Sequence, residues 1–335
     1  MNQFNPERLV FGCQLLGSQI NARYSQKVLN FCYENGICKF DLAERYPFPE
    51  KEDTVGNSEK IFGEWLKNIP REKVIVATKV TGRNNEGWYG LDSKRLTYNR
   101  IQSSIKNSLS RLKSDYIDIF FLHWPDRYTN NFGRKFYNPD HDPEFISFDE
   151  QFEALKESHK RGEIRAIGFA NETPWGLMKF IECNRVSNLQ IYMQDSYSIL
   201  NRNIEVSMKE VILRENLTFQ AHSILAGGLL TGRYKVSNGD YVGEGRLSKL
   251  KHQTRKLRSK EILEGYQILK NFCNERKIEE THLALSFVIS DQFVHEIILG
   301  SASVNQLKNL LEFMKKPVNE DHVNSIKNLI YSTGF

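Results

Sequence analysis

Four polar residues follow or end apolar segments of this chain, a pattern typical of a site for proton transfer. Asp41 ends the apolar segment 37–42, and Tyr46 follows in a loop that nearby prolines make irregular. Lys79 comes directly after the apolar segment 74–78, and His123 ends the run 116–123. A phenol has a pKa of about 10, so Tyr46 would need a cation and a polar neighbour to act as an acid.

The four side chains form a chemically sensible set if they meet. A buried Lys79 beside Tyr46 would stabilise the phenolate and lower the pKa of Tyr46, and Asp41 would pair with Lys79 and hold it. His123 could orient a substrate carbonyl. Each residue alone also has a structural explanation: a strand-end charge, a packed loop tyrosine or a histidine at a rim. Their placement at the ends of three successive predicted strands favours the catalytic interpretation.

Apolar segments and amphipathic segments alternate along the chain. The eight predicted strands are 9–13, 37–42, 74–78, 116–123, 164–169, 189–194, 217–222 and 297–299. Predicted helices cover 25–35, 58–66, 99–112, 148–160, 204–214 and 262–273, and two more begin near residues 174 and 304. Strands that are apolar throughout are typical of parallel sheets covered on both faces.

Eight such units over about 300 residues fit a TIM barrel better than a doubly wound sheet. The stretch at Gly12 lacks the GxGxxG fingerprint of a dinucleotide-binding Rossmann fold. We therefore predict an α/β protein with one domain over residues 1–335, a single (β/α)8 TIM barrel with long substrate loops and a C-terminal helical tail. Residues at the carboxyl ends of barrel strands meet at one mouth, so the four residues can form one site.

Composition narrows the class of protein. The chain is 40% hydrophobic and 26% charged with a net charge of +5, which is ordinary for a globular protein. Its five cysteines are odd in number and form no CxxC pair, which indicates reduced thiols. No segment resembles a signal peptide or a membrane span, so we expect a cytoplasmic protein without a membrane partner.

Two polar clusters have simpler explanations than ligand binding. The basic run 246–260 comes without any nucleic-acid-binding motif, and we expect no nucleic-acid partner. The acidic and histidine residues at 140–144 crowd a single loop, so we expect no metal site.

Segments around the four residues resemble the aldo-keto reductase family. FDLAERY, VATKV and FLHWPD match its signatures, and the resemblance runs from Val10 to about Phe313. SLSRLKSDYIDIFFLHWPD, KRGEIRAIGFANET and SYSILNR resemble the bacterial branch related to potassium-channel β subunits. The resemblance implies that Tyr46 gives a proton to a carbonyl oxygen while NADPH delivers hydride to the carbon, and the reverse in oxidation.

The resemblance also implies a dinucleotide site. Asn171 and Gln194 would hold the nicotinamide carboxamide, and His222 stands where an aromatic residue usually stacks under the nicotinamide. HSILAGGLLTGRY resembles the segment that cradles the pyrophosphate, and its matching residues are Ser223, Leu225, Gly227, Leu229 and Arg233. LGSASVNQLKNL resembles the segment for the adenosine phosphate, and its matching residues are Gly300, Ser301, Ser303, Gln306 and Asn309.

The expected cofactor is NADPH, with NADH as the alternative. Some branches of the family carry bases at the positions of Gly300 and Gln306 to bind the 2′-phosphate. Without these bases, selectivity for NADPH would depend on serine hydroxyls, on Gln306 or on Arg246 from the long loop.

Substrate choice in a barrel lies in its loops. The loops 84–98 and 124–147 carry Trp88 and Trp124, and their aromatic faces suit a sugar as well as an aromatic ketone. We therefore predict a small-molecule aldehyde or ketone as the substrate, with a keto-sugar as one candidate. The alternatives are a cofactor-binding regulatory subunit with little turnover, and a lyase or isomerase that forms a Schiff base at Lys79. The residues carry no indication of the oligomeric state.

Overall fold

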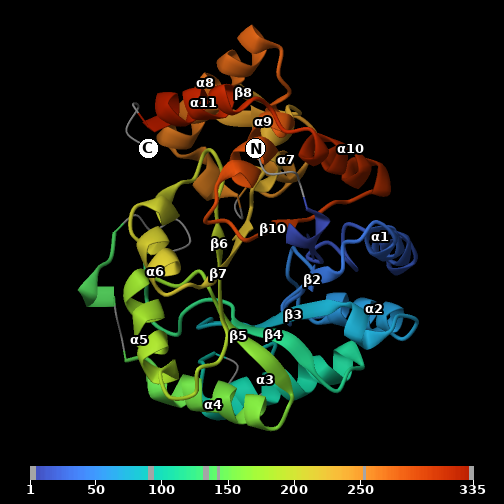
Figure 1. Ribbon diagram of the computed structural model, residues 1–335, viewed down its shortest axis with the longest axis vertical. Helices are drawn as coiled ribbons and strands as arrows, with labels where there is room; N and C mark the ends of the chain where they lie inside the picture. Colours follow the sequence, from blue (N-terminus) through green and yellow to red (C-terminus); the bar gives the residue numbers. More distant parts are fainter. Residues whose placement is uncertain (1–4, 90–93, 131–135, 142–143, 252–253, 332–335) are drawn as a thin grey trace.

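Eight parallel strands close into a barrel in a computed structural model, which describes residues 5–89, 94–130, 136–141, 144–251 and 254–331. The strand order is β1-β10-β7-β6-β5-β4-β3-β2, and Figure 1 shows the helices around the strands. The barrel strands are β1 (Leu9–Gly12), β2 (Lys39–Asp41), β3 (Ile75–Val80), β4 (Ile117–Leu122), β5 (Ile164–Ala170), β6 (Ile191–Ser196), β7 (Thr218–His222) and β10 (Glu296–Leu299). The predicted (β/α)8 TIM barrel is confirmed.

Capped, amphipathic helices surround these strands. They are α1 (Ala22–Glu34), α2 (Asn57–Leu66), α3 (Tyr98–Leu112), α4 (Phe148–Lys160), α5 (Pro174–Asn184), α6 (Met208–Arg214), α7 (Arg246–Lys249), α8 (Lys260–Arg276), α9 (Glu280–Ser290), α10 (Val304–Lys315) and α11 (Glu320–Tyr331). Thr97, Ser147 and Ser303 accept backbone N–H bonds at the starts of α3, α4 and α10. Such caps satisfy donors that would otherwise be unpaired at a helix start.

Three features of the region after β6 differ from the prediction. The predicted helix 204–214 is a 3₁₀ turn, Asn203–Glu205, followed by the shorter α6. Helix α9 was not predicted, because its sequence ETHLALSFVIS is apolar on nearly every side and lacks the usual polar stripe. A small antiparallel hairpin, β8 (Lys235–Ser237) and β9 (Asp240–Val242), lies between β7 and α7.

The apolar core has two parts. The larger lies between the strands and the surrounding helices, and a small cluster of Ala77, Ile119, Phe121, Ala166 and Ala170 lies apart from it. Gly168 is needed beside this smaller cluster, because a Cβ there would lie 2.3 Å from the Phe121 ring.

The C-terminal helix α11 packs on α8 and α9 at the top of Figure 1, which agrees with the predicted helical tail. Among the described residues, no helix combines the length and the apolar character needed to span a membrane. Residues 90–93, 131–135 and 142–143, which belong to the loops predicted to contact substrate and to the polar cluster at 140–144, lie outside the described residues.

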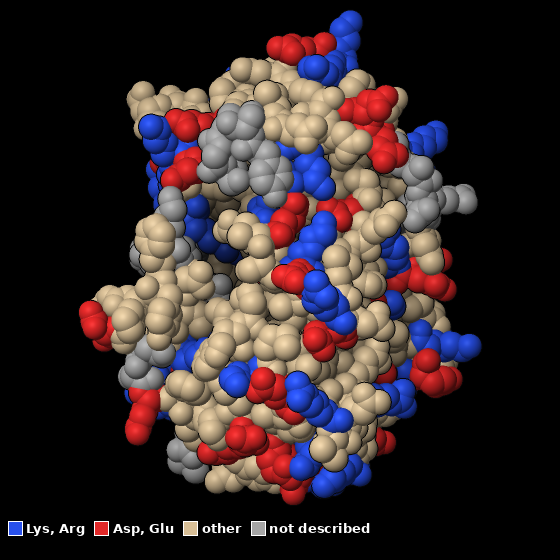
Figure 2. All heavy atoms as spheres, turned by 60° about the vertical axis from the view of Figure 1, so that its left-hand side comes forward, with Lys and Arg blue, Asp and Glu red and all other residues tan. Residues whose placement is uncertain are grey.

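Basic and acidic side chains are interspersed on the face of the molecule that Figure 2 shows. The basic run 246–260 is itself partly neutralised by the β8–β9 hairpin. Lys251 and Arg258 both pair with Asp240 of β9, at 2.5 and 2.7 Å. The positive charge of this run therefore helps to join the long loop after β7 to the hairpin.

Candidate active site

A buried ion pair lies between β2 and β3. Lys79 Nζ is 2.6 Å from Asp41 Oδ1 and donates a second bond to the carbonyl oxygen of Leu42 at 2.7 Å. Lys79 is completely buried and Asp41 nearly so. Burial lowers the pKa of Lys79, and the Asp41 carboxylate opposes that shift by favouring the charged ammonium. The predicted pairing of Asp41 with Lys79 is present.

The net shift in the pKa of Tyr46 is opposite to the predicted lowering. Burial raises the pKa of Tyr46 well above 10, and the negative charge of Asp41 raises it further. The Lys79 ammonium lies 5.3 Å from the centre of the Tyr46 ring, while it directs hydrogen bonds to Asp41 and Leu42. Without bound substrate, Tyr46 is therefore a protonated, buried phenol at neutral pH.

His123 lies against Tyr46, as expected for residues that meet at one mouth. The two rings are 5.9 Å apart and nearly perpendicular. Burial and the nearby charges of Lys79 and Arg45 lower the pKa of His123 well below 6.5, so the imidazole is neutral. Its Nδ1 is buried and makes no hydrogen bond with the described residues. A neutral imidazole can donate one hydrogen bond, which suits a group that orients a carbonyl.

Trp124 borders this site, but Trp88 has no contact with it among the described residues. The Trp124 ring is 5.0 Å from the His123 ring, and its Nε1 donates to the carbonyl oxygen of Arg83 at 2.7 Å. The guanidinium of Arg45 lies over the same ring at 4.5 Å. Trp88 is half-buried and packs beside Tyr89 in the loop after β3.

Two of the predicted carboxamide-binding residues lie near the ion pair. Gln194 Nε2 donates to Asp41 Oδ1 at 2.9 Å, which links β6 to β2 across the barrel interior. Asn171 follows β5 with a left-handed backbone, φ 54°, and its Nδ2 donates to the carbonyl oxygen of His123 at 2.9 Å. Asp41, Lys79, Tyr46, His123, Asn171 and Gln194 are thus brought together.

His222 ends β7 on the same side of the barrel. Its Nδ1 is 3.0 Å from the Ser223 hydroxyl. Burial, together with the positive charges of Lys256 and Lys79, lowers the pKa of His222 to about 3. The imidazole is therefore neutral at physiological pH and offers a flat, uncharged ring.

The segment after His222 winds tightly with several left-handed residues. Ser223, Ala226, Gly227 and Gly228 have φ values of 56°, 47°, 65° and 98°. A Cβ on Gly228 would meet no atom within 4 Å, so the backbone is open at this point. Leu225 precedes the 3₁₀ turn Ala226–Thr231, and Leu229 is buried within it. A tight turn with positive φ can direct backbone N–H groups toward an anion.

Gln306 and Asn309, two of the five residues predicted for the adenosine end, line a pocket of about 430 Å³. Its walls also include Arg233 from the predicted pyrophosphate segment and the carboxylates of Glu279 and Glu312. Ser301 donates to Gln306 Oε1 at 3.1 Å, and Ser303 caps α10 through the Gln306 N–H. Gly300, at the end of β10, has the backbone of Gly12 beside it. A basic side chain thus shares a pocket with the amide side chains and the start of α10.

Arg246 has its contacts in the loops after β1 and β2. Its guanidinium lies 4.0 Å over the Phe48 ring and donates to Gln14 Oε1 at 3.4 Å. Its Nε is buried without a hydrogen bond to any described residue. Burial lowers the pKa of Arg246, and nearby Tyr46 opposes the shift. Its position close to Tyr46 could not be predicted from the sequence, because α7 belongs to a long loop.

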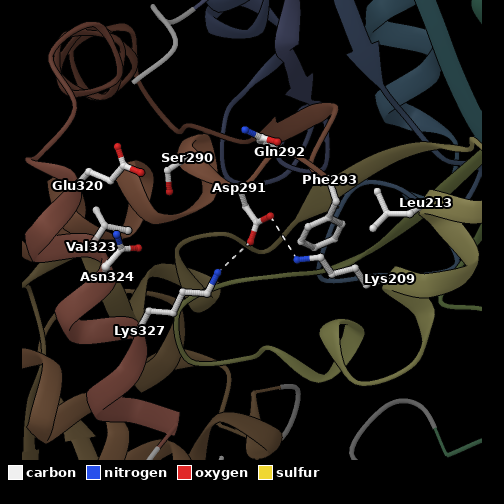
Figure 3. Close-up of a pocket in the computed structure, with 10 residues that line it drawn as sticks. All are labelled: Lys209, Leu213, Ser290, Asp291, Gln292, Phe293, Glu320, Val323, Asn324 and Lys327. Atoms are coloured by element: carbon white, nitrogen blue, oxygen red, sulfur yellow. Dashed lines mark hydrogen bonds and ion pairs between the residues drawn. The ribbon is translucent and has the colours of Figure 1, made fainter.

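A second hollow, of about 330 Å³, lies away from this site (Figure 3). It is formed by α6, α11 and the segment between α9 and β10. Asp291 at its centre pairs with Lys209 and Lys327 at 3.6 and 3.2 Å and accepts from the Tyr197 hydroxyl at 3.0 Å. Because these charges neutralise one another, the cluster joins helices to the barrel and offers no free charge at its centre.

Sequence reasoning missed two polar residues inside the barrel, Gln220 on β7 and Glu296 on β10. Gln220 and Gln194 are register partners, and so are Glu296 and Gln220. Gln220 is a polar residue within the predicted apolar strand 217–222, and that interruption was its signal. Glu296 precedes the predicted strand 297–299, so only the observed start of β10 places it in the barrel. These residues receive no role from the resemblance and are considered below.

The geometry fits a nicotinamide dinucleotide. A buried phenol, two side-chain amides and a neutral imidazole lie at the mouth, and the pocket of Arg233 and Gln306 lies beside the glycine-rich turn. The mouth would take the nicotinamide end of such a molecule, and the pocket would take its adenosine end.

The chain belongs to the aldo/keto reductase family, whose sequence pattern matches residues 8–330. It is 32% identical to Protein tas of Escherichia coli K12 over 318 residues, which cover 93% of this chain and 91% of the relative. It is 30% identical to the NADH-specific methylglyoxal reductase of the same organism, with 82% and 77% covered. It is 26% identical to the L-glyceraldehyde 3-phosphate reductase of that organism, with 94% and 82% covered. The chain is therefore an oxidoreductase of a family that uses NAD(P)H and small-molecule carbonyl substrates.

Proposed function

We propose that this protein reduces an aldehyde or ketone to an alcohol, with Tyr46 as the general acid. The observation that carries the proposal is the buried, protonated Tyr46 beside His123 and the Lys79–Asp41 pair. When bound, a reduced nicotinamide supplies the hydride for the carbonyl carbon. The chain's own residues then have to bind the carbonyl oxygen and give it a proton.

Each residue has a distinct part in this proposal. Neutral His123 donates a hydrogen bond that orients the carbonyl, and Tyr46 gives its proton to the oxygen as negative charge develops there. The Lys79 ammonium, held by Asp41 and 5.3 Å from the centre of the Tyr46 ring, offsets part of the Asp41 charge that opposes the phenolate. Trp124 borders the substrate and Trp88 belongs to a neighbouring loop, so the two offer aromatic faces for a small polar molecule such as a keto-sugar.

The proposed cofactor contacts run from the nicotinamide end to the adenosine end of the dinucleotide. Asn171 and Gln194 hold the carboxamide, His222 lies under the nicotinamide, and the segment from Ser223 to Leu229 cradles the pyrophosphate. Arg233 contributes its charge to the pyrophosphate, and Gly300, Ser301, Ser303, Gln306 and Asn309 hold the adenosine end. We prefer NADPH to NADH because Arg233, which lines the same pocket as Gln306 together with Glu279 and Glu312, also offers a base for a 2′-phosphate. The whole chain acts as one domain in this proposal.

The test is the Tyr46→Phe variant, with NADPH and NADH titrated in parallel and methylglyoxal and glyceraldehyde 3-phosphate as probe substrates. Carbonyl reduction should be lost while cofactor affinity stays almost unchanged, because only the proton donor is removed. Tyr98→Phe is the matched control, since the Tyr98 hydroxyl bonds Glu157 between α3 and α4, and it should keep wild-type turnover. Turnover by Tyr46→Phe would refute the acid assignment. Tight cofactor binding by a wild type that reduces no carbonyl would instead favour a regulatory subunit.

A further inference from the structure

A column of polar side chains crosses the barrel interior, where TIM barrels usually hold layers of branched apolar residues. Gln194, Gln220 and Glu296 are neighbours in register on β6, β7 and β10. Gln194 Nε2 donates to Gln220 Oε1 at 2.9 Å, and Gln220 Nε2 donates to Glu296 Oε2 at 2.6 Å. All three residues are at least nine-tenths buried. Dehydrating these groups costs free energy, and a complete set of hydrogen bonds offsets that cost.

A lysine pairs with the carboxylate at each end of the column. Asp41 accepts from Gln194 at one end and pairs with Lys79. Glu296 accepts from Gln220 at the other end and pairs with Lys39 of β2. The column is therefore two ion pairs joined by two amides, and its formal charges cancel.

The carboxylates permit only one orientation of the two amides. An ionised carboxylate accepts hydrogen bonds and donates none, so Gln220 has to turn its NH₂ group to Glu296. Its oxygen then faces Gln194, which has to turn its own NH₂ group toward Gln220 and Asp41. A reversed Gln194 would place its oxygen against two other acceptors. Both N–H bonds of Gln194 are thus used within the barrel, and its carbonyl oxygen is left as the group that can accept.

We propose that Glu296 is a positioning residue that acts through Gln220 and, together with Asp41 at the other end of the column, fixes the amide orientation of Gln194. The fixed oxygen accepts an N–H of the nicotinamide carboxamide, and Glu296 itself touches neither cofactor nor substrate. The inference rests on the proposed function, because it takes Gln194 as a carboxamide contact. It extends the site to residues that lie deep in the barrel interior.

The test is the Glu296→Gln variant, whose new side chain has the same size but can either accept or donate. Lys39 holds the oxygen of the new amide, so the new NH₂ group faces Gln220, and Gln220 turns its own NH₂ group toward Gln194. Asp41 still demands the NH₂ group of Gln194, so the two neighbours of Gln194 now favour opposite orientations. The readout is the dissociation constant of NADP⁺ compared with that of 3-acetylpyridine adenine dinucleotide phosphate, in which an acetyl group replaces the carboxamide and offers no N–H. The NAD⁺ pair replaces these probes if the protein binds that form.

Wild-type protein should prefer NADP⁺ by about five-fold, the size of one net hydrogen bond. In Glu296→Gln the affinity for NADP⁺ should fall about two-fold, because Gln220 and Asp41 then compete over the orientation of Gln194, while affinity for the acetyl analogue stays the same. Gln220→Leu leaves Asp41 as the one described acceptor for the Gln194 amide, so it should reduce the preference by less than Glu296→Gln does, and it keeps the test valid if one variant folds poorly. Glu205→Gln is the matched control: Glu205 pairs with Arg202 outside the column, so the preference should not change.

The outcomes separate the inference from the proposed function. Equal loss of affinity for both dinucleotides, or an unchanged preference in both column variants, would overturn the positioning role while leaving the reductase proposal intact. A wild type that reduces carbonyls yet binds the two dinucleotides equally would overturn the inference as well. A wild type that binds neither dinucleotide would overturn both.

Discussion

The Lys79–Asp41 pair should be strongly coupled in stability, and a double-mutant cycle can measure the coupling. Both side chains are at least 96% buried and their charged atoms are 2.6 Å apart. Lys79→Met leaves the Asp41 carboxylate buried without its cation, a change that typically costs about 3–5 kcal/mol of unfolding free energy. Asp41→Asn leaves a buried ammonium that still has the Leu42 carbonyl as a partner, so we expect a smaller loss.

The double variant should cost less than the sum of the single variants. With both charges removed, neither position holds an unpaired ion, and the amide oxygen introduced at position 41 can still accept from Gln194. We therefore expect a coupling free energy of at least about 1.5 kcal/mol, against the few tenths typical of independent sites. Equilibrium urea unfolding of the four proteins at pH 7 gives the values.

A surface pair supplies the control for this cycle. Arg214 and Glu210 are 2.7 Å apart on α6, but both side chains are more than two-thirds exposed. Water and salt screen such pairs, so the same cycle at these positions should give a coupling close to zero. If the losses of unfolding free energy in the two single variants sum to the loss in the double variant, the two residues are not held as a buried ion pair. The structural basis of the proposed site would then be wrong.

Two further predictions concern pH. His222 has a pKa of about 3 in the fold and about 6.5 when unfolded, so the unfolded chain binds more protons between these values and stability falls as pH decreases through this range. His222→Gln should therefore lose less stability than wild type between pH 7 and pH 5. The difference should be at most about 2 kcal/mol, since the ring is only half-buried. Thermal unfolding of both proteins at the two pH values measures it, and a larger loss in His222→Gln would contradict the prediction. For the reaction, the raised pKa of Tyr46 keeps the acid protonated, so kcat/KM for reduction should be flat from about pH 7 to 9, and a decline over this range in stopped-flow or steady-state assays would point to another acid.

The strands of the barrel were predictable because each is a short apolar run with a distinct end. A strand that is covered on both faces of a parallel sheet is apolar along its whole length. Eight such segments alternating with helices were therefore enough to predict a (β/α)8 barrel. Helix α9 was not predictable in the same way. Its sequence is apolar around most of its circumference, since it is buried between the barrel and the helices α8, α10 and α11. Periodicity disappears when every side of a helix is covered.

The composition of the site was easier to predict than its electrostatics. Strand ends identified Asp41, Lys79 and His123 because the carboxyl ends of parallel strands converge. The pKa of Tyr46 depends on which neighbour the Lys79 ammonium faces, and it faces Asp41 and the Leu42 carbonyl. That choice follows from side-chain geometry in three dimensions, which spacing along the sequence does not contain. The same limit applies to Arg246, whose contacts depend on the path of a long loop.

The raised pKa of Tyr46 is compatible with a role as an acid. A proton donor in carbonyl reduction is matched against the alkoxide that forms on hydride addition, and an alkoxide is far more basic than a phenolate. A phenol with a pKa above 10 still transfers its proton downhill, and it remains fully loaded at neutral pH. Oxidation of an alcohol would need the phenolate, which burial and the Asp41 charge disfavour. The raised pKa of Tyr46 therefore predicts that any oxidation rate rises with pH near neutrality while the reduction rate does not.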